Sequence, residues 1–400
     1  MKSVFGSVQI VPNPGASSAA TFPVPMRKII DPLETQAIRD QISHWPGYSV
    51  TPLHKLDGLA REICLDRLWY KDESQRFGLK SFKALGGAYA IAKQVRARVL
   101  QETGLEASEM DLLSAKYHSI TQQMVMTCAT DGNHGRSVAW GCQLFGCRCV
   151  IYIHRDVSSG RASAMQQLGA EIVRIDGNYD DAVRQAAGDA VIHGRLVISD
   201  TSYPGYVDIP RDVIMGYTVM LAEIAEQLAG EVPTHVFVQA GVGGLAASVC
   251  GFFWDLWQEK RPRFVVVEPE QANCLQMSAR RGKPTVVTGS LETMMAGLAC
   301  GEVSLAAWEV LGAGVNDFLT VSETSVPETM RLLAQGFGGD PSIEAGESAV
   351  AGLGALITVR NSQKQALQLG LDSNSRVLIL GTEGATDPAL YKKLISRVPL

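Results

Sequence analysis

Apolar residues occur in short runs that alternate with helix-forming segments through the middle of the chain. The runs are rich in valine and isoleucine and are bounded by turn residues, as buried strands are. Between residues 123 and 199 the strand-like runs are QMVMTCA, RCVIYI, EIVRID and RLVIS, and the helix-like segments are HGRSVAWGCQLF, SSGRASAMQQLG and YDDAVRQAAGDA. This alternation predicts βαβ units and a parallel sheet.

The pattern resumes after residue 208. A long helix is expected over 209–230, further strands in HVFVQA, RFVVVEP and RVLILG, and a helix in LAASVCGFFWDLW. The turn-rich stretch TSYPGYVDIP at 201–210 predicts a crossing between two α/β domains. A chain of 400 residues is long enough for two cores. We therefore expect an α/β fold of two interleaved open-sheet domains, a large one from 1–85 and 207–400 and a small one from 86–206.

Composition and charge are those of a soluble globular protein. Apolar residues make up 46% of the chain and charged residues 19%, and the net charge is -5 with both signs mixed along the sequence. No basic block favours binding to nucleic acid, and no apolar run reaches the length of a membrane span. We therefore expect neither a nucleic-acid-binding protein nor a membrane protein.

The N-terminal segment and the cysteines bear on the compartment. The segment MKSVFGSVQIVPNPGASSAATFPVP is interrupted by prolines and lacks a sustained apolar stretch, so it does not resemble a secretory signal. We expect it to be a loosely structured arm that packs on a partner subunit. Most of the eight cysteines lie in apolar runs, without paired CxxC or HExxH motifs. We expect the buried, reduced thiols of a cytoplasmic protein and no metal site.

The first candidate ligand loop is GVGGLAAS, Gly241 to Ser248, directly after the strand HVFVQA. Ligands of open α/β sheets sit beyond the carboxyl ends of the strands. Glycine permits a tight turn close to a phosphate, and the helix that follows presents N–H groups and the positive end of its dipole. The alternative is a dinucleotide fingerprint, since Gly241, Gly243 and Ala246 fit GxGxxA and Glu268, one strand later, is a candidate ribose contact.

Two further loops follow strands in the same way. TCATDGNHGRS, Thr127 to Ser137, brings Thr, Asp, Gly, Asn and His together where a strand becomes a helix, which is more than a helix cap requires. We interpret it as a ligand loop. GTEGATD, Gly381 to Asp387, follows RVLILG and brings the hydroxyl of Thr382 to the same edge of the sheet, although Thr382 alone is equally compatible with a helix cap.

These motifs and their order resemble those of a known family. SFK with Lys83, DGNHG, GVGG and a C-terminal TEG occur in the order found in the pyridoxal-phosphate (PLP) enzymes of fold type II, which share the tryptophan synthase β-subunit fold. More narrowly, the chain resembles the diaminopropionate ammonia-lyases. The supporting stretches are TPL at 51–53, KDES at 71–74, FK at 82–83, ATDGNHGR at 129–136, SDT at 199–201, MAGLACGE at 295–302, GES at 346–348 and TEGATD at 382–387. ATDGNHG is the most specific, because other members of the fold usually carry Ser-x-Gly-Asn-His.

The resemblance implies that Lys83 is the Schiff-base lysine. Burial beside the cofactor lowers the pKa of an amine and leaves it nucleophilic, and the same amine can later remove the α-proton. The hydroxyl of Thr382 would face the pyridine nitrogen. A hydroxyl cannot hold that nitrogen protonated as a carboxylate would, so the site favours loss of a β-substituent over transamination. The cofactor-binding residues implied are Phe82, Lys83, Asn133, Gly241, Val242, Gly243, Gly244 and Thr382.

The carboxylates bear on the substrate. An amine leaves readily only when it is protonated, and a carboxylate near the β-carbon would attract a β-ammonium. By resemblance, Asp131 and Asp200 supply such carboxylates, although Asp200 is equally compatible with a turn residue. Lys83 and Asp131 would take the α-proton of the two enantiomers from opposite faces. The implied catalytic residues are Lys83, Asp131 and Asp200, and the implied substrate-binding residues are Thr130, Asp131, Gly132, His134, Asp200 and Tyr203.

The expected activity is PLP-dependent α,β-elimination of 2,3-diaminopropionate, as one or both enantiomers, to pyruvate and ammonia. The resemblance also implies a cytoplasmic homodimer that acts in amino-acid degradation. A close alternative is an ammonia-lyase or dehydratase acting on another β-substituted or β-hydroxy amino acid, such as serine or threonine. Lys80, which matches no catalytic position of the family, keeps this alternative open. A dinucleotide-dependent oxidoreductase and a catalytically inactive ligand-binding relative are the remaining alternatives.

Overall fold

The computed structural model describes residues 5–130, 132–177 and 179–396. The chain folds into two compact units, which interleave along the sequence. Unit 1 combines the N-terminal residues to Pro32, Val50–Gln75 and the chain from Met220 onwards, and unit 2 combines Leu33–Ser49 with Arg76–Val219. The bounds differ from the predicted ones, because residues 33–49, 76–85 and 207–219 lie in unit 2.

Unit 1 contains a seven-stranded sheet in the order β1-β10-β9-β8-β11-β3-β2. Its five inner strands are parallel, and the two edge strands β1 and β2 run antiparallel to their neighbours. The strands are β1 (Val8–Pro12), β2 (Leu53–Lys55), β3 (Arg67–Asp72), β8 (His235–Gln239), β9 (Arg263–Pro269), β10 (Asp317–Val321) and β11 (Arg376–Gly381). The strands predicted in HVFVQA, RFVVVEP and RVLILG are therefore confirmed.

Helix α15 (Ala351–Arg360) covers the middle of this sheet and packs on β8, β9 and β10. Leu353 and Ile357 of α15 join Phe237, Val265 and Leu319 in one buried apolar cluster. Inner parallel strands can be apolar throughout because both of their faces are covered. The other helices of unit 1 are α2 (Asp57–Glu62), α11 (Gly244–Trp257), α12 (Cys274–Arg281), α13 (Leu305–Gly314), α14 (Ser325–Gln335), α16 (Gln363–Leu369) and α17 (Pro388–Ile395), while α10 (Thr218–Gln227) begins at the boundary with unit 2.

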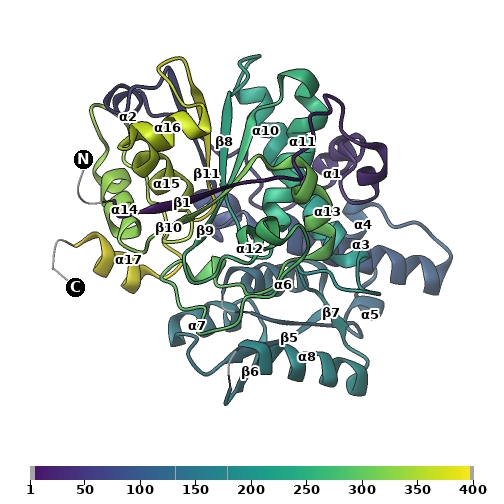
Figure 1. The fold of residues 1–400 in the computed structure, drawn as a ribbon. Coiled ribbons are helices and arrows are strands. Elements are labelled where there is room, and N and C mark those ends of the chain that lie inside the picture. Colours follow the sequence, from purple (N-terminus) through teal and green to yellow (C-terminus); the bar gives the residue numbers. More distant parts are fainter. Residues whose placement is uncertain (1–4, 131, 178, 397–400) are drawn as a thin grey trace. The chain divides into compact units, whose positions relative to one another are not determined.

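Part of the N-terminal segment is an ordered strand, so the prediction of a loosely structured arm is wrong for residues 8–12. These residues form β1 (purple in Figure 1), which pairs antiparallel with β10. Strands β2, β3 and β10 were also not predicted from the sequence. Buried charged residues interrupt the apolar pattern of β3 and β10. Lys71 of β3 forms an ion pair with Glu223 at 2.8 Å, and Asp317 of β10 forms one with Arg263 at 2.6 Å. Pairing offsets the cost of burying such charges.

Unit 2 contains a four-stranded parallel sheet in the order β6-β5-β4-β7. Ala182 and Ala186 of helix α8 pack on Val150 and Tyr152 of β5. The elements are α1 (Thr35–Ile42), α3 (Lys83–Thr103), α4 (Glu109–Leu113), α5 (His118–Thr121), β4 (Val125–Ala129), α6 (Asn133–Phe145), β5 (Arg148–His154), α7 (Ser159–Gln166), β6 (Glu171–Ile175), α8 (Tyr179–His193), β7 (Leu196–Val197) and α9 (Asp208–Gly216). The predicted βαβ units of residues 123–199 are confirmed. In the described parts of both units, no helix combines the length and apolarity needed to cross a membrane.

Close contact between α3 and α9 explains why residues 207–219 belong to unit 2. A Cβ on Gly86 would lie 2.5 Å from the carbonyl oxygen of Val213, and a Cβ on Gly216 would lie 2.3 Å from that of Leu85. Glycine at both positions lets the two backbones touch. The single helix predicted over 209–230 is wrong, because the structure has two helices, α9 and α10, with a break at Tyr217.

Candidate active site

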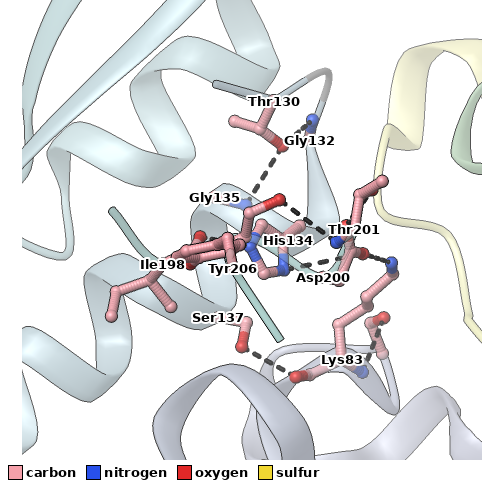
Figure 2. A network of polar contacts seen from close by, with 12 residues as sticks. Lys83, Thr130, Gly132, His134, Gly135, Ser137, Ile198, Asp200, Thr201 and Tyr206 are labelled. Carbon is pink, nitrogen blue, oxygen red and sulfur yellow. Dashed lines mark hydrogen bonds and ion pairs between the residues drawn. The ribbon is translucent and has the colours of Figure 1, made fainter. Parts of the chain in front are cut away.

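Lys83 is the first residue of α3, and groups of unit 2 bond to its backbone carbonyl and to its side-chain Nζ (Figure 2). Its carbonyl oxygen accepts a hydrogen bond of 2.7 Å from the hydroxyl of Ser137 on α6. Its Nζ lies 2.5 Å from Oδ2 of Asp200, and the ring of the preceding Phe82 packs on Tyr217 with 4.7 Å between ring centroids. The lysine is therefore partly buried, with a side chain 20% exposed, and faces a carboxylate.

Asp200 is held ionised by its neighbours. Burial alone would raise the pKa of this carboxyl, but the positive charge of Lys83 and the hydrogen bond from its Nζ outweigh burial and lower the pKa far below its usual range. Asp200 lies in the loop after β7, which Tyr206 fastens. The hydroxyl of Tyr206 donates to the carbonyl of Val197 at 2.8 Å and accepts the N–H of Ser199 at 3.0 Å.

His134 lies beside this pair with a defined tautomer. Its Nε2 is 2.8 Å from the carbonyl oxygen of Ile198, which can only accept, so Nε2 carries the hydrogen. Burial lowers the pKa of His134, which keeps the imidazole neutral. Its Nδ1 then presents a lone pair, 3.8 Å from Oδ2 of Asp200.

A single hydroxyl holds the described part of the DGNHG loop. Oγ1 of Thr130 accepts the N–H groups of Gly132 and Gly135, both at 3.1 Å, and α6 begins at Asn133. Thr130 is buried and follows β4, so the predicted position of this loop at a strand end is confirmed. Asp131, the predicted second carboxylate, lies outside the described residues.

In unit 1 the GVGG loop joins β8 to α11. Gly243 has a φ of +102°, which a residue with a side chain rarely adopts, and a Cβ on Gly241 would lie 2.8 Å from Sγ of Cys300. The 14-residue helix α11 begins at Gly244 with no acidic residue in its first turn. Its first N–H groups and its dipole therefore favour an anion at this end.

Three further motifs of unit 1, MAGLACGE, GES and TEG, are linked to one another by hydrogen bonds. The N–H of Gly297 donates to Oγ of Ser348 at 3.0 Å, and the N–H of Ser348 donates to Oε1 of Glu383 at 2.9 Å. Thr382, next to Glu383, is buried after β11, and its Oγ1 accepts a hydrogen bond of 2.8 Å from Nε2 of Gln239. Hydrogen bonds thus link MAGLACGE, GES and TEG, and TEG also to the last residue of β8. A Cβ on Gly241 would lie 3.3 Å from the carbonyl oxygen of Gly297, so MAGLACGE lies beside the glycine loop.

Glu268 has a structural role that removes it as a ribose contact. Its two carboxylate oxygens accept the N–H groups of Leu275 and Gln276, at 2.8 Å and 2.7 Å, in the first turn of α12. The side chain is fully buried, and burial raises its pKa to about 8. A carboxylate engaged in this way offers no free oxygen to a nucleotide, which argues against the dinucleotide interpretation.

Comparison with known proteins agrees with this geometry. The model of the family described as pyridoxal-phosphate dependent enzyme matches residues 44–383. The chain is 40% identical over 359 residues to diaminopropionate ammonia-lyase of Salmonella typhimurium, covering 88% of this chain and 89% of the relative. The chain belongs to the diaminopropionate ammonia-lyase family of PLP enzymes.

Solved structures of this family give the same result. The holo diaminopropionate ammonia-lyase from Escherichia coli is 36% identical, with a TM-score of 0.88 over 98% of each chain. The same enzyme in complex with an aminoacrylate-PLP azomethine reaction intermediate has a TM-score of 0.85, again at 36% identity over 98% of each chain. The fold is therefore that of the fold type II PLP enzymes, as predicted, and a dinucleotide-dependent oxidoreductase is no longer an alternative.

The residues present fit the cofactor of the family. The glycine loop at the start of α11 offers backbone N–H groups to a phosphate, and side chains at Gly241 and Gly243 would obstruct the loop. Lys83 supplies a primary amine in a partly buried setting. Thr382 supplies a buried hydroxyl beyond a strand end. A phosphate, an aldehyde and a pyridine nitrogen each have a chemically matched partner.

Gln239 organises the site but was not predicted, because it reads only as the end of an apolar strand. From the sequence, Tyr206 is expected to flank the substrate or to serve only in packing, and its hydrogen bonds to the loop of Asp200 were not predicted. Tyr203, a predicted substrate contact, is half exposed and stacks on Tyr206 with ring centroids 4.9 Å apart. Lys80 adopts a φ of +57° in the turn before α3.

Proposed function

We propose that this protein catalyses the PLP-dependent α,β-elimination of 2,3-diaminopropionate to pyruvate and ammonia. The observation that carries this proposal is the 2.5 Å contact between Nζ of Lys83 and the carboxylate of Asp200, in a chain of the diaminopropionate ammonia-lyase family. When bound, PLP supplies the electron sink that allows a proton to leave the α-carbon. The protein supplies the groups that bind the substrate, orient it and move its protons.

We assign the site roles by resemblance to the family, and the 2.5 Å contact between Nζ of Lys83 and Asp200 supports the assignment. We assign Lys83 as the covalent attachment point of PLP and as the base that takes the α-proton at Nζ. The other cofactor contacts in this proposal are Phe82, Asn133, Gly241, Val242, Gly243, Gly244 and Thr382. The proposed substrate contacts are Thr130, Asp131, Gly132, His134, Asp200 and Tyr203.

Asp200 explains why an amine is the favoured leaving group. Its lowered pKa keeps the carboxylate charged, and in the structure that charge faces the ammonium of Lys83. With PLP bound, Nζ of Lys83 would no longer be an ammonium facing Asp200, and the β-ammonium of the substrate is the cation that could take this place. A hydroxyl substituent, as in serine, carries no charge for Asp200 to bind.

A comparison of substrates tests the proposal. We expect diaminopropionate to be turned over at least tenfold faster than serine or threonine, because charge-assisted hydrogen bonds are worth about 1.5–3 kcal/mol and each 1.4 kcal/mol is a factor of ten. Ammonia and keto acid are measured across a panel of β-substituted amino acids. The Asp131→Asn variant should lose activity on D-diaminopropionate more than on the L-isomer. A much faster turnover of serine or threonine than of diaminopropionate would contradict the proposal.

A variant of Tyr206 tests the positioning of Asp200. Tyr206→Phe removes the hydroxyl that fastens the loop at Val197 and Ser199. We expect kcat/KM for diaminopropionate to fall about three- to tenfold, as for the loss of one ordinary hydrogen bond, while PLP affinity is unchanged. Tyr152→Phe is the matched control in unit 2, because its hydroxyl accepts from Arg195 at 2.6 Å and donates to Asp189. An equal loss in both variants would indicate a general loss of stability.

We also propose that the protein is a cytoplasmic homodimer that acts in amino-acid degradation. The proposal rests on the family resemblance and on the cysteines, which are free thiols and mostly buried. Light scattering on the purified protein should give a mass near twice the 43.0 kDa of the chain. A single species with the mass of one chain would refute the dimer.

A further inference from the structure

Gln239 places a buried amide beside the hydroxyl of Thr382. It is the last residue of β8, is 2% exposed and lies just before the GVGG loop. Its Nε2 lies 2.7 Å from the carbonyl oxygen of Leu380, 2.8 Å from Oγ1 of Thr382 and 3.3 Å from the carbonyl oxygen of Ala349. All of these residues belong to unit 1.

The chemistry of these neighbours decides which end of the amide faces them. Carbonyl oxygens only accept hydrogen bonds, so the atom of Gln239 between Leu380 and Ala349 must be the NH₂ group. An amide with the opposite orientation would place an oxygen against two carbonyl oxygens. The two hydrogens of Nε2 therefore go to its two shortest contacts, Leu380 and Thr382. Oγ1 of Thr382 is thereby an acceptor towards Gln239.

A hydroxyl that accepts from one neighbour has its own hydrogen left for another. An unprotonated pyridine nitrogen can only accept, so it matches the hydrogen of Thr382. We propose that Gln239 is a positioning residue that turns the Thr382 hydroxyl into a hydrogen-bond donor to the ring nitrogen of PLP. This inference rests on the proposed function, in which Thr382 faces that nitrogen.

The consequence for the reaction concerns the ring's charge. With PLP bound, Thr382 and Gln239 would keep the ring nitrogen unprotonated, because a neutral hydroxyl donates a hydrogen bond and no proton. The ring would then supply a weak electron sink, which would favour prompt loss of the β-substituent. Gln239 would thus act on the chemistry of the cofactor without touching it.

The test uses the holoenzyme loaded with PLP that carries ¹⁵N in the ring. In Gln239→Met, Oγ1 of Thr382 loses the N–H that it accepts, so its own hydrogen is no longer directed towards the ring nitrogen. We expect the ring resonance to move from the hydrogen-bonded position towards that of a bare pyridine nitrogen, in the same direction as in Thr382→Val. We also expect PLP to bind about two- to tenfold more weakly, as for the loss of one hydrogen bond. An unchanged resonance in Gln239→Met, with a shifted one in Thr382→Val, would overturn the inference.

Two controls separate the possible outcomes. Gln276→Met removes another buried glutamine of unit 1, whose Nε2 donates to the carbonyls of Gln9 and Phe318, and it should leave the resonance unchanged. If Thr382→Val also leaves the resonance unchanged, the proposed place of Thr382 at the ring is wrong and the inference falls with it. If Gln239→Met folds poorly, Gln239→Asn replaces it in the measurement of the ring resonance, because its amide is one carbon shorter and no longer reaches Thr382 in the same way.

Discussion

Replacing Lys83 by alanine is expected to reduce turnover of diaminopropionate on the order of a thousandfold or more. The variant loses the amine that attaches PLP and the base that takes the α-proton, and general acid–base catalysis alone is worth about 10²–10⁴ in rate. Pyruvate and ammonia are measured with the enzyme saturated in PLP. Borohydride treatment of the wild type, followed by peptide mass spectrometry, should place a pyridoxyl group on the peptide that contains Lys83.

Lys93→Ala is the matched control for this experiment. Lys93 lies on the same helix, α3, with an exposed side chain, so the change removes one cation without touching the neighbourhood of Asp200. Its turnover should equal that of the wild type. Full turnover by Lys83→Ala, or a pyridoxyl group on another lysine, would contradict the assignment of Lys83 and move the attachment point elsewhere.

The strand-end loops could be predicted from the sequence because their signals are local. A valine- and isoleucine-rich run followed by glycines, as in HVFVQA and GVGG, specifies a buried strand, a turn and a helix start within a dozen residues. The contact between Lys83 and Asp200 is of another kind, since 117 residues separate them. Only the family resemblance, and no periodicity, linked the two residues before the fold was known.

The errors have a common physical origin in tertiary contacts. Strand β1 gains its stability by pairing with β10, which is more than 300 residues away, so nothing in its own sequence distinguishes it from a loose arm. The break at Tyr217 lies where α9 meets α3 at Gly86 and Gly216. Helical periodicity continues across that break, since it records only which side faces the core. Local patterns therefore predict elements well and their ends and partners poorly.

Replacing Asp200 by asparagine is expected to lower kcat/KM for diaminopropionate by about 10- to 100-fold and to leave the slower reaction of serine nearly unchanged. This fall in kcat/KM corresponds to the loss of one charge-assisted hydrogen bond between the β-ammonium and Asp200, which is worth about 1.5–3 kcal/mol. Burial raises the pKa of Asp200, but the charge of Lys83 outweighs burial and lowers the pKa below its usual range, so the carboxylate is charged at neutral pH, where the two substrates are compared. A carboxyl with a depressed pKa stabilises the fold above its ordinary pKa, and that contribution disappears as the solution is acidified.

Asp189→Asn provides the control, because Asp189 is another carboxylate of unit 2 that accepts hydrogen bonds, from Tyr152 and from Gln185 at 2.8 Å. It should retain the ratio of diaminopropionate to serine activity found in the wild type. The decisive quantity is that ratio, since a distorted fold would lower both activities together. An equal loss on both substrates in Asp200→Asn would contradict binding of the β-ammonium by Asp200, and the preference for an amine would then need another carboxylate.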